Sequence, residues 1–497
     1  MTGPLTLTTR SSKSGGPVPL PRSRFRGIEV AGLALMATLL ALAVANFELN
    51  WVFLGTGALL LFIVAFLSPN AALYILVFSM LLSPEIIVGQ IAGQGTYGRG
   101  LTLRLEDFLI VLIALAWLAH MAVYKDTPVL RSTPLNAPII GYLAVCAVAT
   151  GFGVMAGRVV PATGFLFVFK YFEFAVIFFL VVDLVRDREM IKRLLAAALV
   201  TATIIAVIAI LQIPSGLRVT APFEGDSGEP NTLGGYLVLM LAVTLGLLAG
   251  TKKLSQRILL GILALTLLTP IAYTLSRTSW LALAAMLFTI ILYSRHKVLF
   301  LSLAAGAMLI LLIAPPEEIL DRVRFTVSAP VHTGSIELFG IVIEPSAAAR
   351  LTAWINLVSD IAVHPFLGHG VTGYHFLDSQ YPRTILETGL LGLAMLFWII
   401  WRVYLLAKEV YSRDQGPLGS ALGLGLLAGL GGIVVHCIGA NTFIIVRIME
   451  PFWLLVGLAV VLSTELPEPG EETAQDHLEA GGVRSRVLTG PNHIAPV

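Results

Sequence analysis

Charged residues are scarce in this sequence, and their scarcity argues against a soluble fold. Asp, Glu, Lys and Arg make up 12% of the 497 residues, about half the ~25% that is typical of soluble globular chains. Hydrophobic residues reach 57%, and the mean hydropathy is +0.88. No polar stretch is long enough to form a separate soluble catalytic domain. The composition therefore predicts a polytopic membrane protein whose chemistry lies in its helix bundle and loops.

Cysteine is scarcer still, with two residues in the whole chain. Cys146 and Cys437 fall within or at the edge of apolar runs, where an unpaired thiol packs as a small hydrophobic group. We expect two free packing residues rather than a disulfide. The sequence also lacks a Cys-x-x-Cys motif and a Cys/His cluster, so it predicts neither a metal site nor a cofactor.

Long apolar runs are what the sequence has in abundance. Runs of ~17–25 residues, with a few shorter ones, predict an all-α fold, a polytopic transmembrane bundle of about 12–14 spans. The runs lie near 28–46, 51–67, 70–84, 106–124, 137–155, 164–184, 191–213, 232–250, 257–275, 278–293, 297–314, 384–404, 417–437 and 447–463.

The two ends of the chain differ from this apolar middle, the transmembrane domain at 28–463. Residues 1–27 contain five basic residues and no acid, which predicts a basic cytoplasmic tail. Ala43-Val44-Ala45 could be a signal-peptidase site, but the basic region is long and another span follows at once, so we favour an uncleaved first helix. Residues 464–497 are rich in Gly, Pro, Glu and Ala, as is typical of a disordered tail.

The distribution of basic residues predicts the orientation of the bundle. If the N-terminus is inside and the spans alternate, cytoplasmic segments hold 21 of the 32 basic residues, as the positive-inside rule requires. Both termini are then cytoplasmic, and the large loop at 315–383 is extracytoplasmic.

Lysine is missing from the predicted outer segments. All ten basic residues there are arginine. Part of this bias is expected by chance, because Arg outnumbers Lys by 24 to 8 in the whole chain. The planar guanidinium suits a bidentate grip on phosphate or carboxylate. The ten are Arg99, Arg104, Arg158, Arg218, Arg277, Arg322, Arg324, Arg350, Arg383 and Arg447.

Two predicted outer loops, 214–231 and 315–383, are long enough to form a site. Within the second loop, residues 346–363 place apolar side chains at helical spacing. We expect an amphipathic helix that lies over the bundle or in the membrane interface. A loop of this size suits a lid over an active site.

Several short motifs share this outer placement. In chain order they are Arg218 followed by Pro230-Asn231, Ser276-Arg277, Arg350 with Trp354, Gly368-His369-Gly370, Asp378-Ser379-Gln380-Tyr381 and the run from Glu387 to Gly392. Their order and spacing resemble those of the O-antigen ligase and O-antigen polymerase superfamily of bacterial membrane glycosyltransferases.

The resemblance implies an enzyme of cell-envelope polysaccharide biosynthesis in the bacterial inner membrane. It implies metal-independent transfer or polymerisation of glycans carried on undecaprenyl or another polyprenyl pyrophosphate, at the outer face. The implied partners are this lipid-linked donor, a glycan or lipid acceptor, a flippase and a chain-length regulator, with no nucleic acid. Ligases acting on a lipid A core usually have a His-Asn pair where this chain has Asp378-Ser379. We therefore favour a polymerase and keep the ligase as the alternative.

The implied reaction needs groups that hold the departing pyrophosphate. Bidentate arginines in a partly dry site suit that task, and we expect Arg277 and Arg350 to perform it. Arg277 stands between two apolar spans, where a charge is costly, although it could instead snorkel to the interface. Arg350 could instead be a solvated residue of the amphipathic helix. Second candidates for substrate binding are Arg218, Arg383 and Arg447.

The acceptor hydroxyl needs a base within hydrogen-bond reach. Asp378 occupies the motif position and is the first candidate, although a structural turn residue is an equal alternative. His375 lies three residues earlier and is the second candidate. His369, between two glycines, is typical of a tight turn, and Glu387 could cap the following helix; both are kept as candidates for substrate contact.

Lys170 lies inside the sixth predicted span, close to Glu173. A lysine there should face the bundle interior, where it could contact phosphate or pair with Glu173. We favour the pairing.

Two other classes of protein stay open. A polysaccharide or lipid transporter would need ionisable residues near the bilayer midplane and an inverted repeat; the sequence shows few of the former and no convincing repeat. A metal-dependent glycosyltransferase would need paired acids in an early outer loop, for which Glu106-Asp107 is the candidate.

Overall fold

A computed structural model describes ten segments of the chain. They are residues 49–83, 85–89, 101–124, 131–222, 228–313, 316–327, 336–338, 341–343, 345–414 and 416–465. The predicted first span at 28–46, the signal-peptidase alternative and both predicted tails lie outside the described residues. The chain divides into two units, 1–63 and 64–497. Helix α2 (Leu49–Leu67) contributes the described part of the first unit, and everything below concerns the second.

The second unit is a bundle of apolar helices, which confirms the predicted all-α class. Within the described residues of this unit, nine helices are long and apolar enough to cross a membrane, and three shorter apolar helices join them. Every predicted run from 51–67 onward coincides with a helix. In the second unit these are α3 (Pro69–Leu82), α4 (Leu105–Tyr124), α5 (Asn136–Met155), α6 (Pro161–Leu184), α7 (Arg188–Gln212), α8 (Pro230–Gly250), α9 (Leu254–Tyr273), α10 (Arg277–Tyr293), α11 (Lys297–Ile313), α14 (Gln380–Arg413), α15 (Pro417–Gly419) continued through a π-helical turn (Ser420–Gly425) into α16 (Leu426–His436), and α17 (Val446–Glu465).

Local sequence explains where several helices begin. Pro161 and Pro230 stand at the first position of α6 and α8, where the missing N–H costs nothing. Asp187 and Ser276 are N-caps whose side chains accept hydrogen bonds from the backbone N–H of Met190 and Ser279. Each cap satisfies a donor that the first helical turn leaves unpaired.

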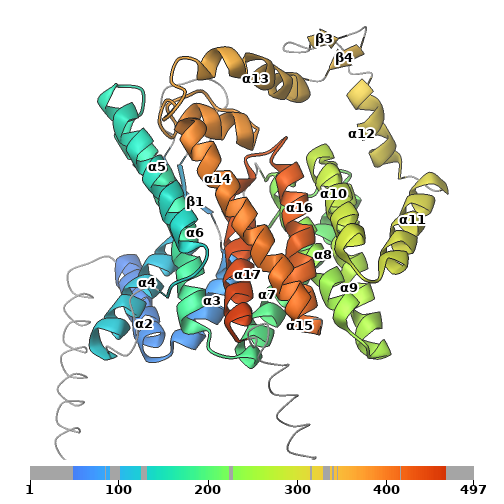
Figure 1. Cartoon of the computed structure of the whole chain (residues 1–497), viewed down its shortest axis with the longest axis horizontal. Helices are drawn as coiled ribbons and strands as arrows, with labels where there is room; N and C mark the ends of the chain where they lie inside the picture. The colour runs from blue at the N-terminus through green and yellow to red at the C-terminus, as the bar shows by residue number, and fades with distance from the viewer. Residues whose placement is uncertain are drawn as a thin grey trace, which may run out of the picture. The chain divides into compact units, whose positions relative to one another are not determined.

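The connections between helices gather at two ends of this unit (Figure 1). One, named here the α13 end, carries helix α13 (Pro345–Ile361) and the starts of α8, α10, α14 and α17. The opposite end, named here the basic end, holds the start of α7, where Arg188 pairs with Asp414 at the end of α14. Every lysine among the described residues lies toward the basic end except Lys170. The two ends reproduce the predicted asymmetry of charge, while their orientation across a membrane stays a prediction.

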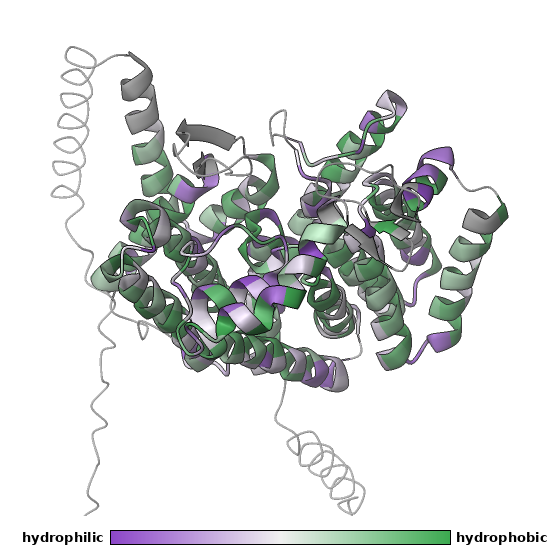
Figure 2. Ribbon diagram, turned by 90° about the horizontal axis from the view of Figure 1, so that it is seen from above, coloured by the Kyte–Doolittle hydropathy of each residue, from purple (hydrophilic) through white to green (hydrophobic). Residues whose placement is uncertain are grey.

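The large loop contains more structure than the sequence predicted. The expected amphipathic helix is present as α13, and it packs on α14. Two other elements precede it, helix α12 (Glu317–Val327) and a hairpin of β3 (Ile336–Leu338) with β4 (Ile341–Ile343). A second antiparallel pair, β1 (Glu85–Gly89) with β2 (Leu101–Arg104), precedes α4. Figure 2 looks onto this end, where hydrophilic and hydrophobic ribbon alternate along α13.

Close helix packing holds the centre of the bundle together. Most of α8 and nearly all of α17 are buried, and α8 packs against α10, α16 and α17. A Cβ at Gly234 would lie 2.1 Å from Ser279 Oγ, so a residue without a side chain lets α8 and α10 approach this closely. Cys146 and Cys437 are free and buried, as predicted.

Helix α14 is broken near its start by Gly389, whose φ of 69° and ψ of −171° are not helical. At this break the backbone N–H of Leu390 donates to Pro365 O, while the carbonyls of Leu386 and Glu387 accept from the loop at 369–370. Gly389 has no Cβ to oppose the positive φ. The break therefore docks the loop that follows α13 onto α14.

Candidate functional site

Arg350 and Asp378, the candidates for binding pyrophosphate and for accepting the proton, meet at the α13 end. Arg350 Nη2 lies 2.6 Å from Asp378 Oδ2, and Arg350 Nε donates to the Asp378 carbonyl at 3.3 Å. The side chains are 19% and 37% exposed, respectively. The pair is thus partly dry yet open to a ligand. The pair joins α13 to the segment that precedes α14. The sequence did not predict this contact between residues 28 positions apart.

Asp378 is held in place by the connection between α16 and α17. Asn441 Nδ2 donates to Leu377 O at 2.6 Å, and Ser379 Oγ donates to Ile438 O at 2.8 Å. The Gln380 N–H donates to Cys437 O at 2.9 Å. Since bonds on both sides of Asp378 fix its backbone, its carboxylate has a defined position. The sequence had indicated no role for this connection.

Arg277 stands at the first position of α10, next to a cluster of backbone carbonyls. Arg218 Nε donates to Thr274 O at 3.0 Å, and Arg322 Nε donates to Leu275 O at 3.1 Å. These carbonyls immediately precede Ser276 and Arg277. The turn before α10 therefore gathers three of the predicted outer arginines at the α13 end.

A buried polar network below Arg277 was not predicted as a unit. Ser276 Oγ donates to Asn231 Oδ1 at 2.6 Å, and Ser279 Oγ lies 2.9 Å from Ser276 Oγ. His436 Nε2 lies 3.5 Å from Ser279 Oγ, and His436 is within electrostatic reach of Arg350. The network ties the Pro230-Asn231 and Ser276-Arg277 motifs to α16. A lone histidine in an apolar span was the signal that could have found it.

Arg383 and Glu387 form a second, buried ion pair. Nε lies 3.0 Å from Oε1, and the side chains are 9% and 7% exposed. The same Glu387 oxygen accepts from the Thr372 N–H at 3.1 Å. The Arg383 guanidinium lies over the rings of Phe167 and Phe376. Glu387 lies about two turns inside α14, so it pairs with Arg383 and the docked loop rather than capping a helix start.

His369 lies in the tight turn that its flanking glycines predicted. Gly368 and Gly370 have φ of 62° and 93°, and His369 contacts the Leu386 carbonyl through its backbone N–H and Nδ1. His375 is exposed, and its ring lies 4.1 Å from that of Tyr374. Desolvation and a hydrogen bond to Asp360 raise the pKa of Tyr374 to about 12, so the phenol stays neutral at physiological pH.

Lys170 and Arg447 lie deeper in the bundle. Lys170 Nζ pairs with Glu173 at 3.1 Å and with Asp107, in agreement with the predicted pairing. Arg447 is 1% exposed and donates to the carbonyls of Leu81 and Pro222, both at 2.9 Å. These bonds tie α17 to the last turn of α3 and to the segment after η1 (Ile213–Ser215).

The paired acids considered for a metal also have partners. Asp107 pairs with Lys170, and Glu106 Oε1 lies 3.4 Å from Arg104 Nη1. Across the described residues, no three His, Cys, Asp or Glu side chains are grouped to hold a metal ion.

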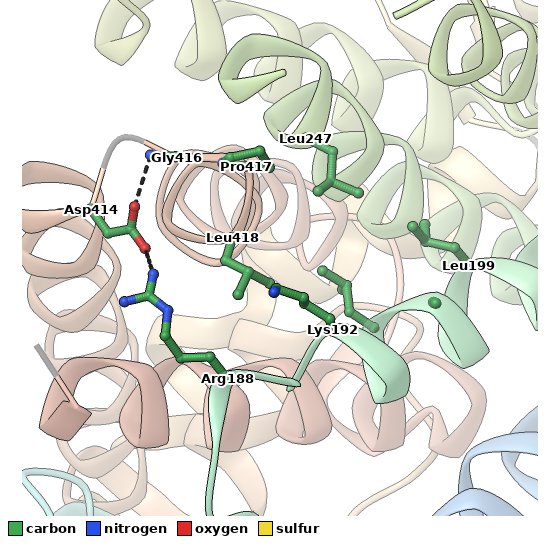
Figure 3. A pocket seen from close by; sticks show the side chains of 10 residues that line it. Arg188, Lys192, Leu199, Leu247, Asp414, Gly416, Pro417 and Leu418 are labelled. Carbon is green, nitrogen blue, oxygen red and sulfur yellow. Dashed lines mark hydrogen bonds and ion pairs between the residues drawn. The ribbon is translucent and has the colours of Figure 1, made fainter. Parts of the chain in front are cut away.

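An open hollow of about 430 Å³ lies at the basic end and is chemically unlike the α13 end (Figure 3). Its one carboxylate, that of Asp414, accepts from the Gly416 N–H at 2.8 Å and pairs with Arg188. Lys192 and apolar side chains such as Leu199 complete its wall. The hollow offers no carboxylate that is open to an acceptor hydroxyl.

Comparison with known proteins finds a family match over part of the chain. Residues 262–397 match the family model described as O-antigen ligase. The matched segment contains Arg277, Arg350, Asp378, Arg383 and Glu387. No curated protein matches the chain.

Proposed function

Because this chain belongs to the O-antigen ligase superfamily, we propose that it transfers a lipid-linked glycan to an acceptor hydroxyl at its α13 end. The observation that carries this proposal is the ion pair between Arg350 and Asp378, 2.6 Å long and partly exposed. It brings an anion-binding group and a proton acceptor together inside the matched segment. The donor is a glycan on a polyprenyl pyrophosphate.

The transfer makes two demands on the protein. The negative charge that grows on the departing pyrophosphate must be neutralised, and the proton of the acceptor hydroxyl must be removed. The acceptor oxygen forms the new glycosidic bond, and the bond between the anomeric carbon and the pyrophosphate oxygen breaks with its electron pair on oxygen. Arg350 and Arg277 stabilise this growing negative charge, because fixed guanidinium donors do so best in a partly dry site. Asp378 takes the acceptor's proton.

The resting ion pair gives an order to these events. Arg350 Nη2 occupies Asp378 Oδ2 before the donor binds. A pyrophosphate carries more charge than a carboxylate and competes for the same guanidinium. Donor binding then draws Arg350 away and frees both oxygens of Asp378 for the acceptor hydroxyl. The base becomes available when the donor is in place.

We favour a polymerase of repeat units over a ligase. Asp378-Ser379 stands where ligases of the lipid A core usually have a His-Asn pair, and the nearby His375 ring contacts Tyr374 rather than Asp378. In this proposal the α13 end faces outward from a bacterial inner membrane. A flippase would deliver the donor, and a chain-length regulator would limit the product.

A transporter is the rival that one structural feature favours. Lys170, Asp107 and Glu173 form a charged cluster within α4 and α6, and the buried Glu450 of α17 is within electrostatic reach of Lys170 and Glu173. Intramembrane charges often mark transport pathways. In this cluster the acids pair with Lys170, as in an ion network that stabilises the fold. The family match also favours the enzyme over the transporter.

The test is turnover by the purified full chain in lipid vesicles. Supplied with a polyprenyl-pyrophosphate-linked repeat unit, the protein should release polyprenyl pyrophosphate and build a ladder of lengthened glycans. A single addition to lipid A core acceptor, with no ladder, would make the protein a ligase. Movement of intact donor across the vesicle membrane without new glycosidic bonds would refute the enzyme and support the transporter.

A further inference from the structure

An apolar groove runs down the side of the bundle between α10 and α14, with α16 as its floor. Its volume is about 520 Å³, within the ~300–1,000 Å³ usual for ligand sites. Figure 1 shows α14, α16 and α10 side by side, and both α10 and α14 pack on α16. The lining includes Phe397, Trp401 and Leu430.

The three hydroxyl groups of this groove have partners within the protein. Thr289 Oγ1 donates to Ala285 O at 2.8 Å, and the hydroxyls of Tyr293 and Tyr404 lie 3.0 Å from each other. The rest of the lining is aliphatic, aromatic or glycine. A ligand finds few hydrogen-bonding groups here, so the groove favours a hydrocarbon chain.

The upper end of the groove connects directly to the candidate site. Tyr381 Oη donates to the carbonyl of the groove residue Val434 at 2.7 Å, and its ring stacks on Phe397 at 5.9 Å. On its other side Tyr381 contacts Trp354, with ring centroids 6.4 Å apart. Trp354 lies one helical turn after Arg350 on α13. Contacts therefore lead step by step from the Arg350–Asp378 pair into the groove.

The groove extends from near the α13 end of α16 toward the basic end. Val434 lies near the α13 end of α16, whereas Tyr293 is the last residue of α10 at the basic end. The lining residues run from Phe397 to Tyr404 on α14 and from Leu427 to Val434 on α16, which is ~10 Å at ~1.5 Å per residue, so the groove takes a segment of a hydrocarbon chain. The Tyr293–Tyr404 pair closes the far end.

We propose that this groove holds a segment of the polyprenyl chain of the glycan donor while the pyrophosphate lies at Arg350. The inference rests on the proposed function, because it names the lipid carrier of that reaction. It makes the groove the feature by which the protein distinguishes polyprenyl carriers from ordinary phospholipids. Phe397 and Trp401 are 48% and 56% exposed, so a chain can enter sideways from the membrane.

The experiment is photolabelling of the full-length wild-type protein in phosphatidylcholine nanodiscs. The probe is undecaprenyl phosphate with a diazirine in its chain, and the labelled peptides are identified by mass spectrometry. We expect labels on α14 and α16 lining residues, reduced at least about tenfold by excess undecaprenyl pyrophosphate and unchanged by equal phosphatidylglycerol. Labels that resist undecaprenyl pyrophosphate, or that phosphatidylglycerol removes equally, would overturn the proposal.

A pair of variants adds a test of activity. Ile400→Trp should fill the groove, reducing turnover of a long-chain donor about tenfold or more while sparing a donor with a short farnesyl chain. Leu281→Trp places the same bulk on an exposed position of α10 outside the lining and should change neither. Equal loss on both donors by Ile400→Trp would count against a role for the groove in holding the chain. If undecaprenyl pyrophosphate competes with the label but the wild-type protein has no transferase activity, the groove remains a lipid site and the proposed function is refuted.

Discussion

Arg383 and Glu387 face each other across one turn of α14, with Nε 3.0 Å from Oε1 and both side chains almost excluded from solvent. The Thr372 N–H donates to the same carboxylate oxygen. The pair therefore fixes the loop after α13 against the broken start of α14. Its burial indicates a positioning role for two residues that the sequence had marked as substrate contacts.

Glu387→Gln should destabilise the protein strongly. The amide keeps the shape of the side chain and can accept from Thr372, but it leaves the Arg383 charge buried without a counter-charge. Breaking a buried pair from one side costs about 3–5 kcal/mol, which thermal unfolding in detergent should register as a clear fall in Tm. The double variant Glu387→Gln/Arg383→Met should recover part of the loss. A Tm of the single variant equal to that of the wild type would show that the pair has no such role.

Much of the fold could be predicted because its causes are local. Apolar runs of span length gave the helices, and helical spacing within 346–363 gave α13. The Lys170–Glu173 pair followed from positions one helical turn apart. Arg383–Glu387 has the same kind of spacing, but placing the helix start at 384 instead of 380 put Arg383 in a loop. An error of one turn concealed the pair.

The rest depended on partners that are distant in the sequence. Asp378 is placed by Asn441 and Ile438, on the connection between two later helices. His436 joins Ser279 across 157 residues. The loop after α13 docks on carbonyl groups that are available as acceptors because Gly389 interrupts the helical hydrogen bonding of α14. Periodicity reports which face of a helix is apolar, but it does not report which neighbour that face will meet.

The orientation of the two ends can be tested with single cysteines. Arg324→Cys lies in exposed α12 at the α13 end, and Lys252→Cys lies between α8 and α9 at the basic end. Both native thiols are buried, so background labelling should be small. In intact inner-membrane spheroplasts an impermeant thiol reagent should label Cys at position 324 and not at 252. Labelling at 252 alone would reverse the proposed orientation.

His364 should make the docked loop sensitive to acid. Partial burial, the adjacent Arg158 guanidinium and His369 lower the pKa of His364 below its ordinary 6.5, and Arg158 Nη1 contacts His364 Nε2. As pH falls below 6.5 the unfolded chain takes up this proton before the folded one, so stability falls until the folded pKa is passed.

The measurement is Tm as a function of pH for the wild type and for His364→Gln. The wild type should lose stability just below pH 6.5, with the difference from the variant becoming constant at lower pH. Above pH 7 the pH dependence of the two proteins should be the same. Parallel curves throughout would show that His364 does not titrate differently on folding.

Arg350→Lys and Arg277→Lys should each reduce turnover at least ~10²-fold, the scale of losing one transition-state donor. Lysine keeps the charge but loses the planar fork, so it cannot bind a pyrophosphate through two parallel hydrogen bonds. Arg324→Lys is the matched control, since Arg324 is 73% exposed on the same end of the bundle. Normal turnover by both of the first two variants would remove them from the proposed reaction.

Asp378→Asn should stop chain growth while leaving donor binding intact. The amide keeps the size of the carboxylate and can still accept from Arg350, but it cannot take the acceptor's proton. Binding depends on the arginines, whereas the chemical step needs the base. The variant should therefore retain lipid-linked donor in a pull-down yet form no product ladder. His375→Gln should reduce the ladder less, because the exposed imidazole can affect orientation alone.

The two variants together decide which group is the base. A full ladder from the Asp378 variant with none from the His375 variant would move the base to the imidazole. Full ladders from both would mean that catalysis needs no base from this segment, and that departure of the pyrophosphate, assisted by arginine, limits the rate. Loss of donor binding by Asp378→Asn would instead show that the carboxylate positions Arg350, in which case Asp378→Glu should restore binding before it restores turnover.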